Sequence, residues 1–355
     1  MNRRQFLLAL AAFGSGTAFP VFAAIEKPLS EVAPFGIREA DSETHQPFGS
    51  AHPKIGLVAV GSAGCGMLTS LHGKLPYLSR TVAIDTSPFA LYRALADQYI
   101  LIGAHSDKPS DPNAARFLAK AAKREIQVAV ADLDIVFILG GLGGAAGTGI
   151  SPIVADITRE AGVLTVAAPV FPFSFEGGRR LQIAKSGVNA LSRRAQATVV
   201  LPNELFSLSA GADELLNTVL EQAPASFEHL YRSIAMVFSQ QSLIGTDQED
   251  FRAAMSLGNG HALFGYGAAD GSHAALDALD TAVKHVLLGP TPLSRTAGVF
   301  VAVEAKPDSL KMASLSRILK SMGNYAPSAQ CFYGAVPNTE MDHDFRVSIL
   351  ATGNV

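Results

Sequence analysis

The amino-acid sequence predicts an α/β fold built on a doubly wound parallel sheet. From Lys54 onward, short apolar segments of strand length alternate with helix-like segments, the pattern that gives a parallel sheet covered by helices. Two glycine-rich segments, "GSAGCGM" and "GGLGGAAGTGISP", each follow a predicted strand, where such sheets bind their ligands. A chain of 355 residues with 48% hydrophobic and 17% charged residues is long enough to fold as two domains with sizeable cores.

Six segments of this first part of the chain are expected to form strands. Each is short and rich in Val, Ile or Leu, and helix-like stretches separate them. In chain order, the predicted strands are residues 54–60, 81–85, 99–102, 134–139, 162–168 and 197–202.

The composition excludes several classes of protein. The net charge is −3 at pH 7, so no excess of Lys and Arg is present to neutralise duplex phosphates, and we expect no nucleic-acid partner. The two cysteines, Cys65 and Cys331, provide neither a disulfide framework nor the spacing of zinc ligands. The segment "TEMDHDF" at 339–345 groups acidic residues with a histidine, but neighbours on a strand or hairpin point to opposite faces. We therefore predict no protein metal site.

The N-terminal segment has the features of a leader. Residues 1–24 combine the basic pair Arg3 and Arg4 with an apolar stretch and small residues near its end, which resembles a twin-arginine export signal. The alternative is an uncleaved membrane anchor, because the apolar run is only just long enough to cross a bilayer and contains Pro20. Residues 25–53 are expected to be a flexible linker.

The two glycine-rich segments predict an anion site. Ser151 followed by Pro152 has the pattern of a helix N-cap and first helical residue, so the second segment is expected to lead into a helix N-terminus. Backbone amides at a helix start favour an anion, and phosphate is the commonest one. The alternative is that the glycines serve only to let the loop pack closely on the sheet.

The motif "GSAGCG" also has a weak likeness to the dinucleotide-binding fingerprint. Ala63 stands in place of its second glycine, and Asp85 lies about where a ribose-binding acid belongs. A P-loop is excluded because no glycine-rich segment ends in Lys-Ser or Lys-Thr. The second segment is not part of the dinucleotide fingerprint and needs another explanation.

The segment "GGAAGTG" at 143–149 resembles the phosphate-binding signature of the tubulin and FtsZ superfamily of GTP-dependent filament proteins, and FtsZ is the closer likeness. The resemblance runs from Lys54 through "SPIVADITREAG", "FEGGRR" and "LPNE" to "ATG" near the C-terminus. It implies a Rossmann-like GTPase domain with a long central helix at 54–243 and a smaller α+β domain at 244–355. It also implies GTP as ligand, Mg²⁺ with it, and head-to-tail self-assembly.

The resemblance assigns nucleotide contacts residue by residue. The first glycine segment would hold the α- and β-phosphates and the second the β- and γ-phosphates, while "FEGGRR" and "LPNE" would contact the ribose. Leu220 occupies the position of the aromatic residue that stacks on guanine. The nucleotide-binding residues implied are Gly61, Ser62, Ala63, Gly64, Cys65, Gly143, Gly144, Ala145, Ala146, Gly147, Thr148, Gly149, Glu176, Arg180, Asn203 and Leu220.

The resemblance also assigns two catalytic acids. In "SLIGTDQEDF", Asp247 and Asp250 match the carboxylates that the family inserts into the nucleotide site of the neighbouring subunit. Carboxylates that orient a water in line with the γ-phosphate suit phosphoryl transfer to water. The alternative is that Asp247 simply caps the next helix.

Several residues depart from the family pattern. Ala145 and Ala146 replace Gly and Thr, which removes a hydroxyl contact to phosphate, and Gly245 replaces Asn in the intersubunit loop. Pro224 and Ala225 replace the polar residues that read the base, so base selectivity is expected to be relaxed. The loop at 104–115 is short, and the residues that order Mg²⁺ and the γ-phosphate have no identifiable match. No tail peptide for division-protein adaptors is expected, because the sequence ends at Val355.

Pro224 has a further consequence for the central helix. Its ring removes an amide donor and clashes with the preceding turn, so we expect a kink or break there.

Three functions remain after these observations. The first, which we favour, is a GTP-hydrolysing filament protein of cell division or membrane remodelling, in the cytoplasm and attached to the inner face of the membrane if residues 1–24 anchor it. The second is a degenerate nucleotide-binding scaffold without hydrolysis, which export to the periplasm would favour because the nucleotide pool is cytoplasmic. The third is an NAD-binding oxidoreductase, against which the second glycine segment argues.

Overall fold

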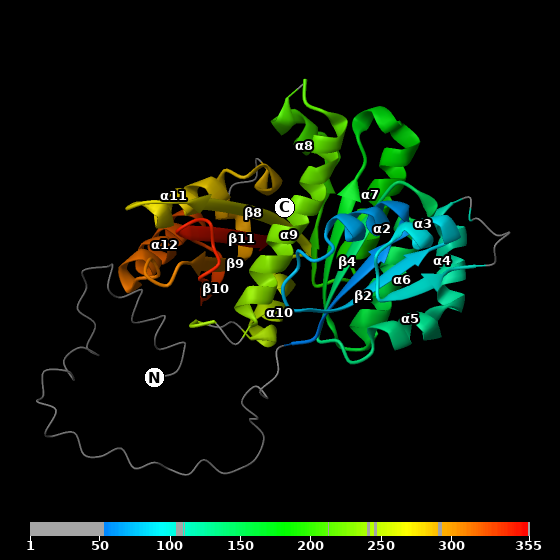
Figure 1. Ribbon diagram of the computed structural model, residues 1–355, viewed down its shortest axis with the longest axis horizontal. Helices are drawn as coiled ribbons and strands as arrows, with labels where there is room; N and C mark the ends of the chain where they lie inside the picture. The colour runs from blue at the N-terminus through cyan, green and yellow to red at the C-terminus, as the bar shows by residue number, and fades with distance from the viewer. Residues whose placement is uncertain are drawn as a thin grey trace, which may run out of the picture.

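The computed structural model describes residues 53–103, 109, 111–211, 213–239, 242–244, 247–289 and 293–353 (Figure 1). The predicted leader or anchor at 1–24 and the predicted linker, apart from Pro53, lie outside the described residues, as do Gly245 and most of the short loop after residue 103. No helix of the described residues has the length and apolar character needed to cross a bilayer.

Eleven strands of the described residues form one sheet, in the order β10-β9-β11-β8-β6-β5-β4-β1-β2-β3, with β7 paired to β5. All pairings from β3 across to β8 are parallel, whereas β11 runs antiparallel to both β8 and β9. This confirms the predicted α/β class, and each predicted strand overlaps an observed one. The strands are β1 Ile55–Val60, β2 Leu78–Asp85, β3 Gln98–Leu101, β4 Ile135–Gly141, β5 Leu164–Phe171, β6 Ala197–Val199, β7 Leu201–Pro202, β8 His261–Ala269, β9 Thr296–Ala305, β10 Gln330–Pro337 and β11 Phe345–Gly353.

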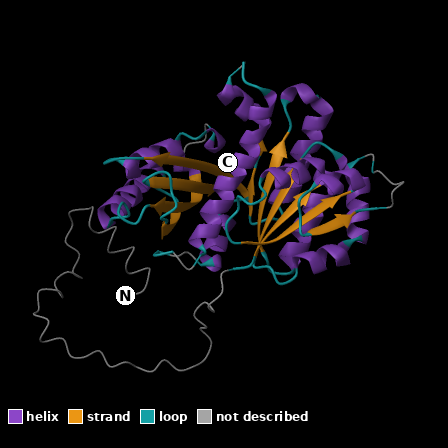
Figure 2. Cartoon of the chain, in the orientation of Figure 1, coloured by secondary structure: helices purple, strands orange, loops and turns teal. Residues whose placement is uncertain are grey.

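Helices cover both faces of the parallel strands (Figure 2). Along β1, Leu57 and Ala59 belong to a core shared with α2, α3, α8 and α9, and Val58 and Val60 belong to a core shared with α4 to α7. Because both faces are buried, these strands are continuous apolar runs. The helices are α2 Gly61–Ser70, α3 Pro88–Arg93, α4 Pro112–Ala121, α5 Lys123–Val130, α6 Ala145–Glu160, α7 Gly178–Ser192, α8 Asn203–Ala210, α9 Leu216–Val237, α10 Gln248–Ser256, α11 Ala274–Val283 and α12 Met312–Tyr325.

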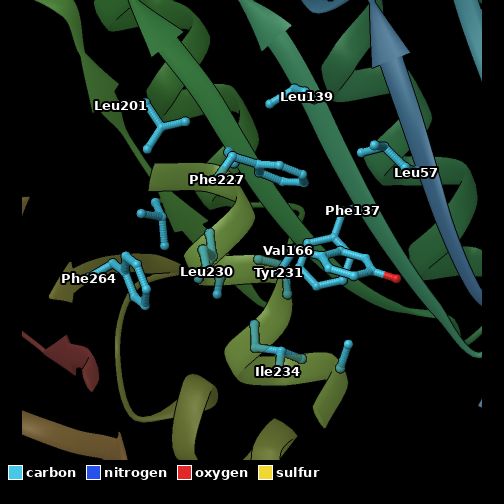
Figure 3. Close-up of a cluster of buried hydrophobic side chains, with 14 of the residues drawn as sticks. Leu57, Phe137, Leu139, Val166, Leu201, Phe227, Leu230, Tyr231, Ile234 and Phe264 are labelled. Carbon is cyan, nitrogen blue, oxygen red and sulfur yellow. The ribbon is translucent and has the colours of Figure 1, made fainter. Parts of the chain in front are cut away.

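The long helix α9 runs between the strands of the two halves of the chain (Figure 1). Its apolar side chains pack on β4, where the ring of Phe137 lies 5.8 Å from Phe227 and 4.9 Å from Tyr231, centroid to centroid (Figure 3). Pro224 is buried inside this 22-residue helix, so the helix is not broken there, and a kink at Pro224 stays a prediction. The buried face that follows Pro224 holds the helix together, because tertiary packing supplies most helix stability in proteins.

The second half of the sheet joins the first through a short pairing. Only Thr198 with His261, and Val199 with Ala262, are paired between β6 and β8. The second half has an additional core of its own, formed by β8 to β11, α11 and α12. The domain boundary predicted at residues 243 and 244 stays a prediction, because the sheet and the core around α9 continue across it.

An aromatic stack joins α9 to the second half. The ring of His229 on α9 lies 3.9 Å from that of Tyr266 on β8, and the ring of Tyr266 lies 4.2 Å from that of His285, centroid to centroid. Burial lowers the pKa of His229 to about 4, and the positive charges of Arg346 and Arg232 contribute to the lowering. Burial alone lowers the pKa of His285 to about 4. Both imidazoles are therefore neutral in the folded protein near pH 7.

This stack predicts that stability falls in mild acid. Below pH 6.5 an unfolded histidine binds a proton, whereas His229 and His285 stay neutral until about pH 4. Protons then favour the unfolded chain, so the free energy of unfolding should fall between pH 6.5 and pH 4, by on the order of 3 kcal/mol for each histidine. Urea unfolding across this range measures the loss. His229→Phe keeps an aromatic ring without a titrating group and should remove about half of the fall, because His285 still titrates. An unchanged slope would show that His229 does not contribute.

Candidate functional site

Two helices begin at the carboxyl ends of adjacent strands. α2 starts directly after β1, and α6 starts after β4 with Gly144 as its N-cap. The glycine-rich segments are thus mainly first turns of helices rather than loops. The prediction that Ser151 is an N-cap is wrong, because Ser151 and Pro152 lie buried inside α6. Only three residues lie between β4 and the helix, and Gly144 supplies the extended conformation of the N-cap.

Several glycines allow the two helices and the sheet to approach closely. A Cβ at Gly147 would lie 2.0 Å from the carbonyl oxygen of Gly141, and one at Gly64 would lie 2.5 Å from that of Leu139. Gly61 opens α2 with φ +74°, a conformation that favours glycine. Close packing therefore accounts for these positions. It does not account for Gly144, where a Cβ would meet nothing within 4 Å.

The starts of both helices are suited to an anion. Neither N-terminus has a side-chain cap, and neither has an acidic residue in its first turn. The unpaired amides and the helix dipole then provide positive partial charge at one edge of the sheet. Thr148 is buried, and its hydroxyl oxygen accepts a hydrogen bond from the amide of Gly143 at 2.9 Å, so this amide is already engaged.

Arg180 places a guanidinium, paired with a carboxylate, beside the start of α6. Gly143 has φ +97°, and a Cβ there would lie 2.5 Å from Cγ of Arg180, so the arginine stem lies against this glycine. Glu176 holds the arginine in place through a 3.0 Å ion pair with its Nε. The carboxylate of Glu176 also accepts a 2.8 Å hydrogen bond from the amide of Phe173. Glu176 and Arg180, which the resemblance assigned to the nucleotide, are thus in contact with each other and border the second glycine segment.

Asp85 has a structural task that argues against a dinucleotide site. The side chain is 2% exposed at the end of β2. It accepts hydrogen bonds from the hydroxyl of Ser62 at 2.9 Å and from the amides of Thr86 and Ser87 at 2.6 and 3.0 Å. These partners satisfy the carboxylate and hold the start of α2 against the turn after β2. It is not presented to a ribose.

Asn203 and Leu220 lie on the helices that follow β7. Asn203 begins α8 and is buried, and its Oδ1 has no hydrogen-bond partner among the described residues. A ribose hydroxyl would satisfy that acceptor. Leu220 on α9 is 42% exposed and apolar, and Pro224 one turn later is buried. Neither of these two side chains provides a polar group that could read a base.

Asp247 and Asp250 are not close to the glycine segments. α9 has 22 residues and spans about 33 Å, and the two acids follow its far end, at the start of α10 (Figure 1). Asp247 caps α10 by accepting a 2.6 Å hydrogen bond from the amide of Asp250, so it does have the capping role considered as the alternative. The two acids cannot reach an anion held at α2 and α6 of the same chain.

The acidic segment at 339–345 is engaged in pairing. Nδ1 of His343 lies 2.8 Å from Oδ2 of Asp270, and Nζ of Lys306 lies 3.1 Å from Oδ1 of Asp344. No group of three His, Cys, Asp or Glu residues in the described part of the chain is arranged to hold a metal ion.

The structure also shows a cavity that sequence reasoning missed. It measures about 330 Å³ and lies between α2 and α3, lined by Ser62, Cys65, Gly66, Thr69, Ser87, Phe89, Ala90 and Arg93. The only signal in the sequence was the aromatic residue in "SPFALYR", whose 68% exposure becomes evident from the fold.

Comparisons with known proteins agree with this geometry. A family model described as the GTPase domain of the Tubulin/FtsZ family matches residues 54–209, and one described as the C-terminal domain of the FtsZ family matches residues 260–354. The cell division protein FtsZ 1 of Methanocaldococcus jannaschii is 30% identical over 331 residues, covering 92% of this chain and 90% of the relative. The cell division protein FtsZ of Neisseria gonorrhoeae is 29% identical over 306 residues, covering 84% and 78%.

Solved structures extend the likeness. An empty FtsZ dimer of M. jannaschii superposes with a TM-score of 0.75 at 30% identity, covering 85% of this chain and 89% of the other. A GTPγS-bound protofilament of CetZ2 from Haloferax volcanii gives 0.68 at 20% identity, covering 84% and 93%, and shares the fold. With the two helix N-termini at adjacent strand ends, these matches show that the chain belongs to the tubulin/FtsZ family.

Proposed function

We propose that this chain binds GTP, assembles head to tail into filaments and hydrolyses the nucleotide at the contact between subunits. The observation that carries the proposal is the pair of uncapped helix N-termini, α2 and α6, at adjacent strand ends with Arg180 beside them. A triphosphate lying across both helices would face amides and a guanidinium and no first-turn carboxylate. Mg²⁺ would accompany it, since the ion binds largely through the phosphates of its nucleotide.

Self-assembly follows from where the acids lie. Asp247 and Asp250 lie beyond the far end of α9, a helix about 33 Å long, so we infer that they act only on the nucleotide of another subunit. Head-to-tail stacking brings opposite ends of identical subunits together and generates an open filament. A family member is described as a dimer and another as a protofilament, which supports this arrangement.

Sedimentation of the full chain with GTP and Mg²⁺, with released phosphate measured in the same tubes, tests the proposal. We expect the chain to pellet with GTP, to release phosphate in step with assembly, and not to bind NAD. Retention of NAD with no binding of GTP would support the oxidoreductase instead and overturn the proposal.

A non-hydrolysing scaffold is the second candidate. It is favoured by Ala145 and Ala146 at the start of α6, which offer no hydroxyl to a phosphate. Nucleotide-dependent pelleting without phosphate release would identify this function in the same experiment.

Relaxed base selectivity is a further prediction. Selectivity of about 100-fold or more requires buried polar groups that pair with the base, and Leu220 and Pro224 provide none. ATP should therefore compete appreciably with GTP in equilibrium competition. A GTP preference above about 100-fold would show that other residues read the base.

The cellular setting is part of the proposal. The curated relatives are named for cell division, and a GTP-dependent filament needs the cytoplasmic nucleotide pool. We therefore place the chain in the cytoplasm, with residues 1–24 attaching it to the inner face of the membrane. Fractionation of cells that produce the full chain, compared with a chain lacking residues 1–24, tests this location. Recovery from the periplasm would contradict it.

A further inference from the structure

We propose that one flank of the subunit pairs with the same flank of a second copy of this chain, so that two filaments lie side by side and run in opposite directions. The flank is formed by α3 and by β3, the last strand of the sheet. The arrangement in filaments rests on the proposed function, because it takes the subunits to stack head to tail. The contact between two flanks does not itself require a nucleotide.

Exposed apolar side chains gather on this flank. Single exposed apolar residues are common on protein surfaces, but five of the fifteen exposed large apolar side chains in the described residues fall between residues 89 and 101. Phe89 and Tyr92 lie one turn apart on α3. The five, which we call the flank patch, are exposed to 68% at Phe89, 88% at Tyr92, 47% at Leu95, 51% at Tyr99 and 36% at Leu101.

The flank patch continues from the end of α3 onto β3. The hydroxyl of Tyr99 donates to the carbonyl of Ala94 at 3.1 Å and accepts from the amide of Ala96 at 3.2 Å. The tyrosine therefore lies against the turn that carries Leu95. Leu101 follows Tyr99 by two residues, so both side chains point to the same face of the sheet.

The outer edge of β3 is open to another strand. β3 pairs with β2 on one side, and no strand of the described residues pairs with it on the other. Such edges are usually protected by charged residues or proline, but Gln98–Leu101 reads "QYIL" and contains neither. A strand is the partner whose amides and carbonyls match this edge. Two copies offer identical edges, which pair antiparallel about a two-fold axis.

Head-to-tail stacking leaves this flank uncovered. The phosphates would bind at the carboxyl ends of the strands, and the catalytic acids lie beyond the far end of α9, so the filament axis follows the strands. β3 runs parallel to β2 and closes the sheet on the side away from β8 to β11, where Figure 1 also shows α3. A contact there joins neighbouring filaments and not successive subunits. Because the paired strands are antiparallel, the two filaments point in opposite directions.

The flank patch is large enough for a weak but specific contact. A fully exposed Phe or Tyr side chain offers roughly 200 Å², so the exposed parts of the patch amount to on the order of 500 Å² on each subunit. Two copies would then bury about 1,000 Å², the lower limit for a specific interface. Arg93 and Asp97 next to the patch have opposite charges, so two copies do not repel each other. Along a filament the contact repeats at every subunit, and many weak contacts act together.

Electron microscopy of filaments assembled with GTP and Mg²⁺ tests the pairing. Tyr92→Glu places a charge in the flank patch at a fully accessible position. The matched control is Phe117→Glu, 74% exposed on α4, which packs on the other face of the sheet. We expect pairs of filaments from the unaltered chain and from Phe117→Glu, and single filaments from Tyr92→Glu with unchanged release of phosphate. Pairs whose subunits point in the same direction would contradict the antiparallel contact.

A charge swap separates loss of the contact from damage to the fold. Tyr92→Lys filaments should also be single, because two positive patches repel. Filaments of Tyr92→Glu mixed with filaments of Tyr92→Lys should form pairs again, since carboxylates of one then face ammonium groups of the other. Mixtures that stay single would show that the flank patch does not meet its own copy.

Sedimentation equilibrium without nucleotide completes the test. The unaltered chain and Phe117→Glu should form dimers, and Tyr92→Glu should weaken the dimer by at least about tenfold, as expected for an aromatic residue central to a contact. Single filaments and no dimers from the unaltered chain would refute the inference and leave the proposed function standing. Dimers that Tyr92→Glu weakens, with no filaments under GTP, would refute the proposed function and leave the contact standing. If Tyr92→Glu reduces binding to phosphatidylglycerol vesicles but not pairing, the patch faces a membrane and the inference is wrong.

Discussion

Gly144→Trp should abolish nucleotide binding while leaving the fold intact. Gly144 is the N-cap of α6, with φ −101° and ψ 176°, an extended conformation that tryptophan adopts without strain. A side chain there would meet no protein atom near its Cβ and would occupy the space before the free amides. We expect GTP affinity to fall by at least about 100-fold, which corresponds to about 2.7 kcal/mol, with an unchanged melting temperature.

The control is Gly323→Trp on α12. A Cβ at Gly323 also meets nothing within 4 Å, but this helix belongs to the other half of the chain. It should bind GTP like the unaltered protein. Equal affinities of the Gly144→Trp and unaltered chains would show that the phosphates do not approach the start of α6, and the proposed site would be wrong.

Asp250→Ala should bind GTP with normal affinity and lose turnover by about 100-fold or more, the scale expected for a positioned acid or base. The change keeps the cap of α10, because Asp247 accepts from the backbone amide of Asp250, which alanine retains. Asp247→Ala is a poorer test, since loss of the cap would itself cost roughly 0.5–2 kcal/mol of stability. Phosphate release at saturating GTP, with assembly measured by sedimentation, gives the result.

Mixing the two variants tests whether catalysis crosses the subunit contact. A Gly144→Trp subunit cannot hold phosphate but keeps both Asp247 and Asp250. An Asp250→Ala subunit holds phosphate but has lost one of these two acids. Neither should hydrolyse GTP alone, and together they should recover part of the activity. Full activity of the isolated Asp250→Ala chain would show that the segment at the start of α10 serves only to cap the helix. Absence of recovery in mixed filaments would place catalysis within one subunit.

Local patterns were sufficient to predict the strands of the first half of the chain, β1 to β7, and the edge of the sheet that carries the site. Apolar runs such as "IVFIL" are fully buried strands, and both glycine segments do follow strand ends. The same local rules misplaced the start of α6 and predicted a break at Pro224. In both cases the proline lies on the extensively buried face of a helix, so tertiary packing outweighs the lost amide.

Features that depend on contacts between distant residues were not predictable. Asp85 matched a ribose-binding position in the sequence. Its carboxylate instead accepts hydrogen bonds from Ser62 and from the turn amides, and these contacts follow only from how β1 and β2 pair. The cavity beside Phe89 and the stack of His229 on Tyr266 likewise arise where separate helices and strands meet. No periodicity or motif in the sequence indicates which helices and strands will be in contact.

The narrow pairing between β6 and β8 has a mechanical consequence for a filament. Neighbouring strands such as β8 and β11 share eight paired positions, whereas β6 and β8 share two, so a bending load on a subunit would concentrate its strain at this seam. α9 lies along the seam and Arg252 of α10 bridges it, donating to the carbonyl of Gly162 at 2.6 Å. We therefore expect a subunit to bend more easily between its two halves than within either of them. Curvature of a filament could then be taken up inside its subunits, without opening the contacts that join one subunit to the next.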